Sequence, residues 1–251
     1  MMEWYYMLAL AGVGLVVGFI NIMAGGGSVL SLPMLMFLGL PANVANGTNR
    51  IGILFQSIVG VNTFHRKKVF DLRTDYKLTI PAVIGSVAGA LFAVEIEEAL
   101  LRKIIAGLMV VMLLMVILKP EAWVREHAGK AEAKPTVLQY IIFFFIGFYG
   151  GFIQMGVGFF LLAGLVVGCG HNLVKANAIK VLITLVFTIF SIGIFVWNQQ
   201  VDILAGLVLA VGNMGGAWLG ARFMIKNGAK YVRYVLIVAM VLVILNLFGV
   251  F

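Results

Sequence analysis

The chain has 251 residues, of which 63% are hydrophobic and only 11% are charged, and its formal net charge is +8. A soluble domain carries about 25% charged residues, so this composition excludes an ordinary soluble protein and predicts a membrane protein. It also excludes a nucleic-acid-binding domain, because 13 of the 18 Lys and Arg residues lie in three loops too short to fold into a basic domain.

Apolar segments follow one another along the chain, and five fall in each half. We expect them at 4–23, 28–40, 44–64, 76–94 and 100–118, and again at 137–154, 159–169, 175–196, 202–221 and 231–249. Most approach the roughly 20 residues that a helix needs to cross the hydrocarbon of a bilayer. The period-two alternation of a membrane β-barrel is absent. The sequence therefore predicts an all-α polytopic membrane protein.

The second half of the chain repeats the first in an alignment that needs no gap. The glycine and polar matches are Gly25 with Gly156, Gly27 with Gly158, Asn46 with Asn177, Asp71 with Asp202, Gly85 with Gly216, Gly89 with Gly220 and Arg102 with Arg233. Asp71 and Asp202 then stand at equivalent helix starts, where we expect them to act as N-caps. The repeat divides the chain into a first half at 1–118, a linker at 119–136 and a second half at 137–251.

The charges of equivalent loops differ between the two halves. The loop at 65–68 is basic, whereas its equivalent at 196–199 is uncharged. The loop at 95–98 is acidic, whereas its equivalent at 226–229 contains a lysine and is flanked by further basic residues. Because Lys and Arg favour cytoplasmic loops, the halves are predicted to cross the membrane in opposite directions, as inverted-topology repeats.

Inverted halves require an odd number of crossings in each half. Five crossings satisfy this condition, and so do three crossings with a non-crossing hairpin made by the first two segments. We expect the basic loops at 65–77, 119–134 and 222–233 to face the cytoplasm.

The second segment of each half is short and follows a glycine-rich turn. The two segments are residues 28–40, after Gly25, Gly26 and Gly27, and residues 159–169, after Gly156 and Gly158. Ser28 is expected to cap the first of these segments. Short, glycine-interrupted segments at matching places in the two halves indicate the binding site of a transporter.

Polar residues inside the apolar segments gather in the third segment of each half. They are Asn46, Thr48, Asn49 and Arg50 in the first half and Asn177 and Lys180 in the second, with Gln56 and Thr184 further along. Asn21 and Gln154 lie beside the glycine turns. Polar groups in hydrocarbon are costly, so these residues are functional candidates.

No carboxylate lies inside a predicted span, so Arg50 and Lys180 have no acidic partner there and favour an anionic ligand. Glycine turns that open into helices add backbone N–H donors for an anion. The predicted substrate-binding site comprises Asn21, Gly25, Gly26, Gly27, Ser28, Asn46, Thr48, Asn49, Arg50, Gln154, Gly156, Gly158, Asn177 and Lys180. The alternative is that Arg50 and Lys180 reach out to opposite membrane interfaces as anchors.

Signatures of enzymes are missing from the sequence. It contains no HExxH motif, no Walker loop and no Gly-x-Ser-x-Gly motif. No catalytic residue, cofactor or metal site is predicted, and the single cysteine, Cys169, cannot build a thiolate metal site alone. The lack of buried acids disfavours coupling through carboxylates, whereas sodium held by carbonyls and amides stays open.

At these motifs the chain resembles the TauE/SafE family, also called the toluene-sulfonate uptake permease family. The resemblance covers nearly the whole chain and rests on residues 18–28 with Pro33, on Ala45–Asn49, and on their echoes at 150–158 and 175–180. It implies a multi-pass protein of the bacterial inner membrane that moves sulfur-containing organic anions, sulfite or related small anions, most often outward. The family often shows Thr-Ser where this chain has Thr48-Asn49 and Ile179-Lys180, which leaves open a different substrate.

We therefore predict a secondary transporter that exports small sulfur-containing anions, such as sulfite or organosulfonates, by alternating access between its halves. The expected partners are the anionic substrate and the lipid bilayer, with no nucleic acid and with homo-oligomerisation left open. The alternatives are a channel-like anion conduit, an uptake permease for other small organic anions, and a membrane scaffold that transports nothing.

Overall fold

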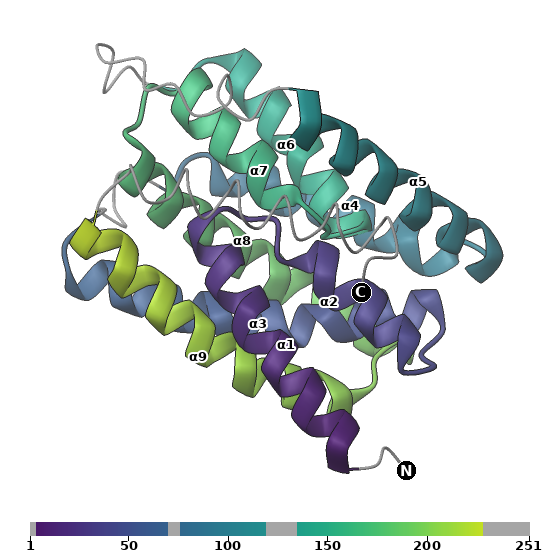
Figure 1. Cartoon of the computed structure of the whole chain (residues 1–251). Coiled ribbons are helices and arrows are strands. Elements are labelled where there is room, and N and C mark those ends of the chain that lie inside the picture. Colours follow the sequence, from purple (N-terminus) through teal and green to yellow (C-terminus); the bar gives the residue numbers. More distant parts are fainter. Residues whose placement is uncertain (1–3, 70–75, 119–134, 228–251) are drawn as a thin grey trace.

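The computed structural model describes residues 4–69, 76–118 and 135–227, and these parts of the chain form helices and no strand (Figure 1). The helices are α1 (Trp4–Met23), α2 (Ser28–Phe37), α3 (Ala42–Arg66), α4 (Thr79–Glu95), α5 (Glu98–Leu118), α6 (Val137–Phe152), α7 (Val157–Ala163) with a π-helical turn (Gly164–Gly168), α8 (Leu173–Trp197) and α9 (Ile203–Asn227). The predicted all-α fold is confirmed over these residues. The expected segment at 231–249 and most of the linker lie outside them.

The helices differ in their capacity to cross a membrane. Among the described residues, α1, α8 and α9 are long and apolar enough to do so. α3 is as long as α8, at 25 residues, but contains the polar run that begins at Asn46. α2 has only ten residues, and α7 has seven before its π-helical turn. The short second segment predicted in each half is therefore confirmed.

The two halves exchange partners, because the first helix of each half packs along the fourth helix of the other. α1 lies beside α9, and α6 lies beside α4 (Figure 1). Between these pairs, α3 packs against α8 and α9, and α8 packs against α4. α3 and α8 begin and end at equivalent positions of the repeat, Ala42 with Leu173 and Arg66 with Trp197. The register found in the sequence therefore holds for these two helices.

Glycines let both outer helix pairs approach closely. A Cβ atom at Gly18 of α1 would meet the backbone of α9 at Asn213, and a Cβ atom at Gly151 of α6 would meet the backbone of α4 at Ser86. Small residues of this kind allow helix backbones to pack closely in a membrane, where lipid removes the hydrophobic drive for helix association.

The glycine contacts of the outer helix pairs can be compared with the gapless sequence match. Gly85 and Gly89 of α4 face the backbone oxygens of Phe144 and Phe148, and Gly216 and Gly220 of α9 face those of Leu15 and Phe19. The gapless match of Gly85 with Gly216 and of Gly89 with Gly220 therefore agrees with these contacts. The facing residues of α6 and α1 differ from the gapless match by two positions, and so do the ends of these two helices, Phe152 and Met23.

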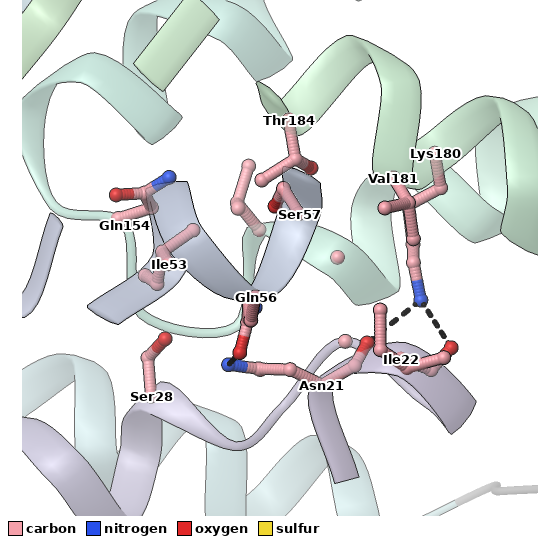
Figure 2. A pocket seen from close by; sticks show the side chains of 13 residues that line it. Asn21, Ile22, Ser28, Ile53, Gln56, Ser57, Gln154, Lys180, Val181 and Thr184 are labelled. Atoms are coloured by element: carbon pink, nitrogen blue, oxygen red, sulfur yellow. Dashed lines mark hydrogen bonds between the residues drawn. The ribbon is translucent and has the colours of Figure 1, made fainter. Parts of the chain in front are cut away.

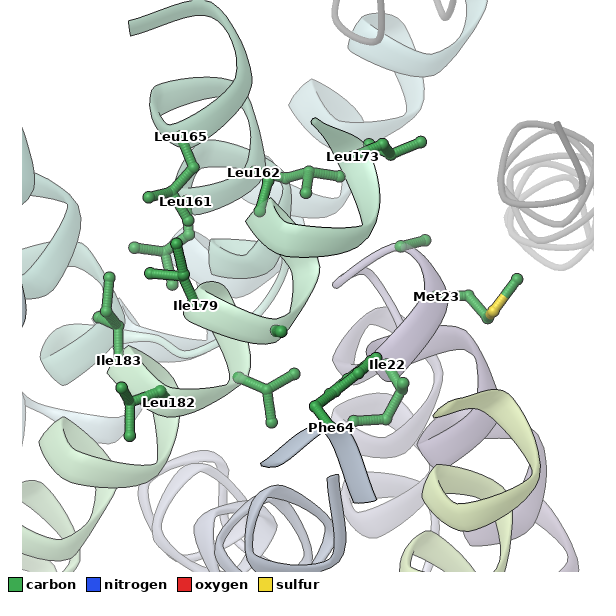
Figure 3. Close-up of a cluster of buried hydrophobic side chains, with 14 of the residues drawn as sticks. Ile22, Met23, Phe64, Leu161, Leu162, Leu165, Leu173, Ile179, Leu182 and Ile183 are labelled. Atoms are coloured by element: carbon green, nitrogen blue, oxygen red, sulfur yellow. The ribbon is translucent and has the colours of Figure 1, made fainter. Parts of the chain in front are cut away.

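A cluster of buried apolar side chains joins the ends of α1 and α3 to α7 and α8 (Figure 3). It includes Ile22 and Met23 of α1, Phe64 of α3, Leu161 of α7 and Ile183 of α8. Lipid is as apolar as these side chains, so the cluster stabilises the fold through close packing. It holds the end of α1 against α8, next to the polar residues of that helix.

The α4–α6 contact can be tested with one glycine substitution. Gly89→Ala is expected to lower stability by about 1–3 kcal/mol, because the added methyl group would meet the backbone oxygen of Phe148. The matched control is Gly193→Ala on α8, where nothing lies within 4 Å of the added Cβ atom. Thermal melting of the purified variants measures the difference. Equal melting temperatures would contradict the close packing of these helices.

Candidate functional site

A cavity lies where the turns after α1 and α6 meet the middle of α3 and α8 (Figure 2). Its polar lining residues are Asn21, Ser28, Gln56, Ser57, Gln154, Lys180 and Thr184. Ile22, Ile53, Val157 and Val181 supply apolar walls, and Gly25 and Gly158 complete the lining. No carboxylate is among these residues, so the cavity presents amides, hydroxyls and one ammonium group.

The cavity is small in this structure. It has about 20 Å³ of space for the centre of a water molecule, enough for one or two waters. A sulfonate group has four non-hydrogen atoms and needs more room than one or two waters, so its binding would require the lining side chains or helices to move apart.

The glycines of the predicted site bring the two turns into contact. A Cβ atom at Gly25 or at Gly158 would meet the backbone of the other residue. Gly25 also has a φ of +90° and Gly156 a φ of +72°, a left-handed conformation that favours glycine. Gly26, Gly27 and Gly156 are not among the lining residues. These five glycines therefore shape the turns and their close approach.

Arg50 is fully buried and holds the end of α6. Its Nη1 atom donates to the carbonyl oxygen of Gly150 and to the hydroxyl of Ser191, both at 3.1 Å. Its Nη2 atom donates to the carbonyl oxygens of Gly151 at 2.6 Å and Phe152 at 3.4 Å. Arg50 is not among the residues that line the cavity. In this structure the guanidinium therefore binds helix carbonyls, not open space.

Two further contacts complete the end of α6. The guanidinium carbon of Arg50 lies 4.3 Å from the centre of the Phe195 ring, a cation–π contact. Asn46 donates its amide Nδ2 to the carbonyl oxygen of Phe152 at 2.8 Å. The carbonyl oxygen of Tyr149 accepts from the backbone N–H of Ile153. All four of the last carbonyl groups of α6 thus have donors, as a buried helix end requires.

Lys180 has the corresponding role at the end of α1. Its ammonium group donates to the carbonyl oxygens of Asn21 at 2.9 Å and Ile22 at 3.1 Å, and to Asn177 Oδ1 at 2.6 Å. An ammonium has three N–H donors, so all three are occupied by protein atoms. Unlike Arg50, Lys180 also lines the cavity, where its charge acts on any ligand (Figure 2).

The third helix of each half therefore holds the first helix of the other half by a buried cation. Among the described residues, neither cation has a carboxylate partner, and the ion pair of Arg102 with Glu98 is an exposed one on α5. A helix C-terminus carries a partial negative charge, which favours a cation there. The C-terminal ends of α6 and α1 thus take the place that a carboxylate would have beside Arg50 and Lys180.

Thr48 and Asn49 connect neighbouring helices and are not among the cavity lining residues. Thr48 accepts the backbone N–H of Asp202 through its hydroxyl at 2.8 Å, and Asn49 accepts the hydroxyl of Ser31 at 2.6 Å. Asp202 caps α9, as predicted, by accepting the backbone N–H of Ala205 at 2.9 Å. Asp71 lies outside the described residues.

The predicted cap of α2 is wrong. Gly27 occupies the N-cap position, and no side chain caps it. The backbone N–H of Gly27 donates to Asn21 Oδ1 at 2.7 Å, while Ser28 lines the cavity. Asn21 reaches this donor because the glycine turn brings the chain back beside the last turn of α1.

Of the predicted site residues, the cavity brings together Asn21, Gly25, Ser28, Gln154, Gly158 and Lys180. Gln56, Ser57 and Thr184 line it too, although sequence reasoning did not assign them to the site. For Thr184 the helical spacing in the sequence could have predicted this, because it lies one helical turn after Lys180 and therefore shares its face of α8. Among the described residues, no three His, Cys, Asp or Glu side chains gather closely enough to hold a metal ion.

Comparison with known proteins gives a consistent set of relatives. The family model described as sulfite exporter TauE/SafE matches residues 10–247. The probable membrane transporter protein YfcA of Escherichia coli (strain K12) is 33% identical over 228 residues, which cover 90% of this chain and 83% of the relative. The probable membrane transporter protein ORF9 of a Sinorhizobium species is 28% identical and covers 92% of this chain and 88% of the relative. No solved structure matches the chain significantly.

The capping role of Arg50 can be tested with one substitution. Arg50→Gln is expected to lower the free energy of unfolding by about 3 kcal/mol, because it leaves the carbonyl groups of Gly150 and Gly151 buried without donors. The matched control is Lys103→Gln, which removes an exposed cation on α5 and should change stability by less than about 0.5 kcal/mol. Denaturation of the purified proteins in detergent measures both. Equal stability of the two variants would refute the capping role.

Proposed function

The chain belongs to the sulfite exporter TauE/SafE family and is a membrane transporter, and on that basis we propose that it carries small sulfur-containing anions such as sulfite or organosulfonates. We further propose export as the direction of transport and alternating access between the two halves as its mechanism. The protein would then lie in the inner membrane of a prokaryotic cell, with the basic loops at 65–77, 119–134 and 222–233 on the cytoplasmic side.

The composition of the cavity supports an anionic substrate. Seven polar residues line it, none of them acidic, and one of them is Lys180. The N–H donors of Lys180 point to carbonyl oxygens, but its positive charge still acts over the few ångströms across the cavity. A buried cation in the ligand's place would face this charge without a counterion, whereas an anion would compensate it. This acid-free cavity beside a buried lysine is the observation that carries the proposal.

The position of the cavity supports alternating access. It lies between the two halves, at the contact of Gly25 with Gly158, and has room for one or two waters. Transporters of this type bind substrate between repeats that move against each other around the site. Movement of one half against the other about the contacting turns would enlarge the cavity. We propose that Asn21, Ser28, Gln56, Ser57, Gln154, Lys180 and Thr184 then contact the substrate.

The substrate class can be tested on the purified protein. We expect sulfite or a sulfonate such as taurine or sulfoacetate to raise the melting temperature in a concentration-dependent way, because a ligand that binds only the folded state stabilises it. Sulfate and thiosulfate test the tolerance for other sulfur oxyanions, and carboxylates are the controls. Stabilisation by carboxylates or cations alone would exclude sulfur-containing anions as substrates.

The mechanism needs a separate experiment. Proteoliposomes loaded with the anion that stabilises the protein should show saturable counterflow of labelled anion, because an alternating-access carrier exchanges substrate across the membrane. A flux that does not saturate and shows no counterflow would support a channel-like conduit. No flux at all from correctly inserted protein would support a scaffold.

A further inference from the structure

Asn21 is the point at which four parts of the site meet. It lies in the last turn of α1 and is 7% exposed. Its side chain accepts from the backbone N–H of Gly27 at 2.7 Å and donates to Gln56 Oε1 of α3 at 3.2 Å. Its carbonyl oxygen accepts from Lys180 of α8 at 2.9 Å. One residue thus joins the glycine turn to α3 and α8 at the wall of the cavity (Figure 2).

The direction of these hydrogen bonds follows from the backbone. The N–H of Gly27 can only donate, so the Asn21 atom that faces it must be the oxygen. The nitrogen of the Asn21 amide therefore faces Gln56 and has to donate. The Gln56 atom that receives this bond must then be its oxygen. One backbone donor thus determines which atom of each amide is the oxygen and which is the nitrogen.

These two hydrogen bonds leave the Nε2 atom of Gln56 without a partner. Gln56 lines the cavity, and none of the described residues accepts a hydrogen bond from its Nε2 atom. Nε2 is also accessible, because it does not belong to the described atoms that are both buried and without a partner. The amide nitrogen therefore remains open to a ligand, and it can only donate.

The second half of the chain lacks this fixed polarity. Gln154, beside the other glycine turn, donates its Nε2 atom to the hydroxyl of Thr188 at 2.7 Å. A hydroxyl both donates and accepts, so the amide of Gln154 could turn over and keep a hydrogen bond. The Oε1 atom of Gln154 is buried and has no partner. The orientation of the Gln154 amide is therefore not fixed by its partner, whereas Gln56 presents a donor alone to the cavity.

We propose that Gln56 is a specificity-determining residue whose Nε2 atom donates to an oxygen of the anionic substrate, and that Asn21 is the positioning residue that holds it in this orientation. This inference rests on the proposed function, because it concerns the same cavity. Lys180 supplies charge but has no free N–H, so the amide of Gln56 provides a directed hydrogen bond that the lysine cannot give. An amide held as a donor favours anion oxygens and rejects groups that can only donate.

The test replaces this donor by an acceptor of the same shape. Gln56→Glu keeps an oxygen for Asn21 and directs a carboxylate oxygen to the cavity. Binding of methanesulfonate, which stays ionised across the pH range used, should weaken at least about tenfold at neutral pH and recover as the pH is lowered, because the protonated carboxyl group is a donor again. Because Lys180 lines the same cavity and can also titrate, the wild type is measured over the same pH range, and the recovery counted for Gln56→Glu is the part that exceeds the wild-type change. Isothermal calorimetry or thermal shift of the full-length protein measures both.

Gln56→Met is the matched control, since it has a similar length and no donor at any pH. We expect weak binding without recovery at low pH. Melting curves without ligand show whether both variants are folded. Binding by either variant at neutral pH with wild-type affinity would overturn the role of Gln56. Failure of the wild-type protein to bind methanesulfonate, sulfite or any sulfonate would instead overturn the proposed function.

The role of Asn21 requires a double-mutant cycle. Asn21→Asp still accepts from Gly27 but can no longer donate, so Gln56 must turn its nitrogen to the new carboxylate and present its oxygen to the cavity. The single variant should weaken methanesulfonate binding by about tenfold, but it should add little to the loss in a Gln56→Met background. Fully additive losses would show that Asn21 acts independently of Gln56 and would overturn its positioning role.

Discussion

Two helices of this protein end in its interior, and the carbonyl groups at those ends must find donors where water is scarce. Away from water, each carbonyl without a donor costs several kcal/mol. Arg50 supplies three of the donors for α6, and Lys180 supplies two for α1. Both cations come from the third helix of the opposite half. The contact between the halves and the position of the glycine turns depend on these two caps.

The caps also account for the unusual distribution of charge. A buried cation normally requires an acidic partner, and none of the described interior residues provides one for Arg50 or Lys180. The negative ends of α1 and α6 take that place. The interior can therefore hold cations while the cavity remains free of carboxylates. An anion that enters meets a positive field and neutral donors, with no acid to repel it.

The halves share a plan but differ where the ligand would bind. α3 and α8 occupy the same register, and both capping residues lie near the start of these helices. The guanidinium of Arg50 donates through its Nη atoms to the end of α6 and to Ser191 and lies against the ring of Phe195, whereas the ammonium of Lys180 borders the cavity. Asn21 holds Gln56 in one orientation, whereas Gln154, beside the other glycine turn, donates to a hydroxyl that imposes none. A ligand between the halves therefore meets a fixed amide donor from α3, and the amide of Gln154 does not repeat it.

The sequence by itself determined the membrane location, the all-α fold, the repeat and the short helices after glycine turns, because these follow from composition, period and local backbone chemistry. It also indicated Lys180, Asn21 and Gln154 as residues of a polar site. Only the tertiary structure decided that Arg50 faces the end of α6 and that Gln56 faces the cavity. Both residues are polar and lie on one helix, so their roles depend on which neighbour each face meets. For Arg50 that neighbour belongs to the opposite half of the chain, far away in the sequence, and no local pattern records the pairing.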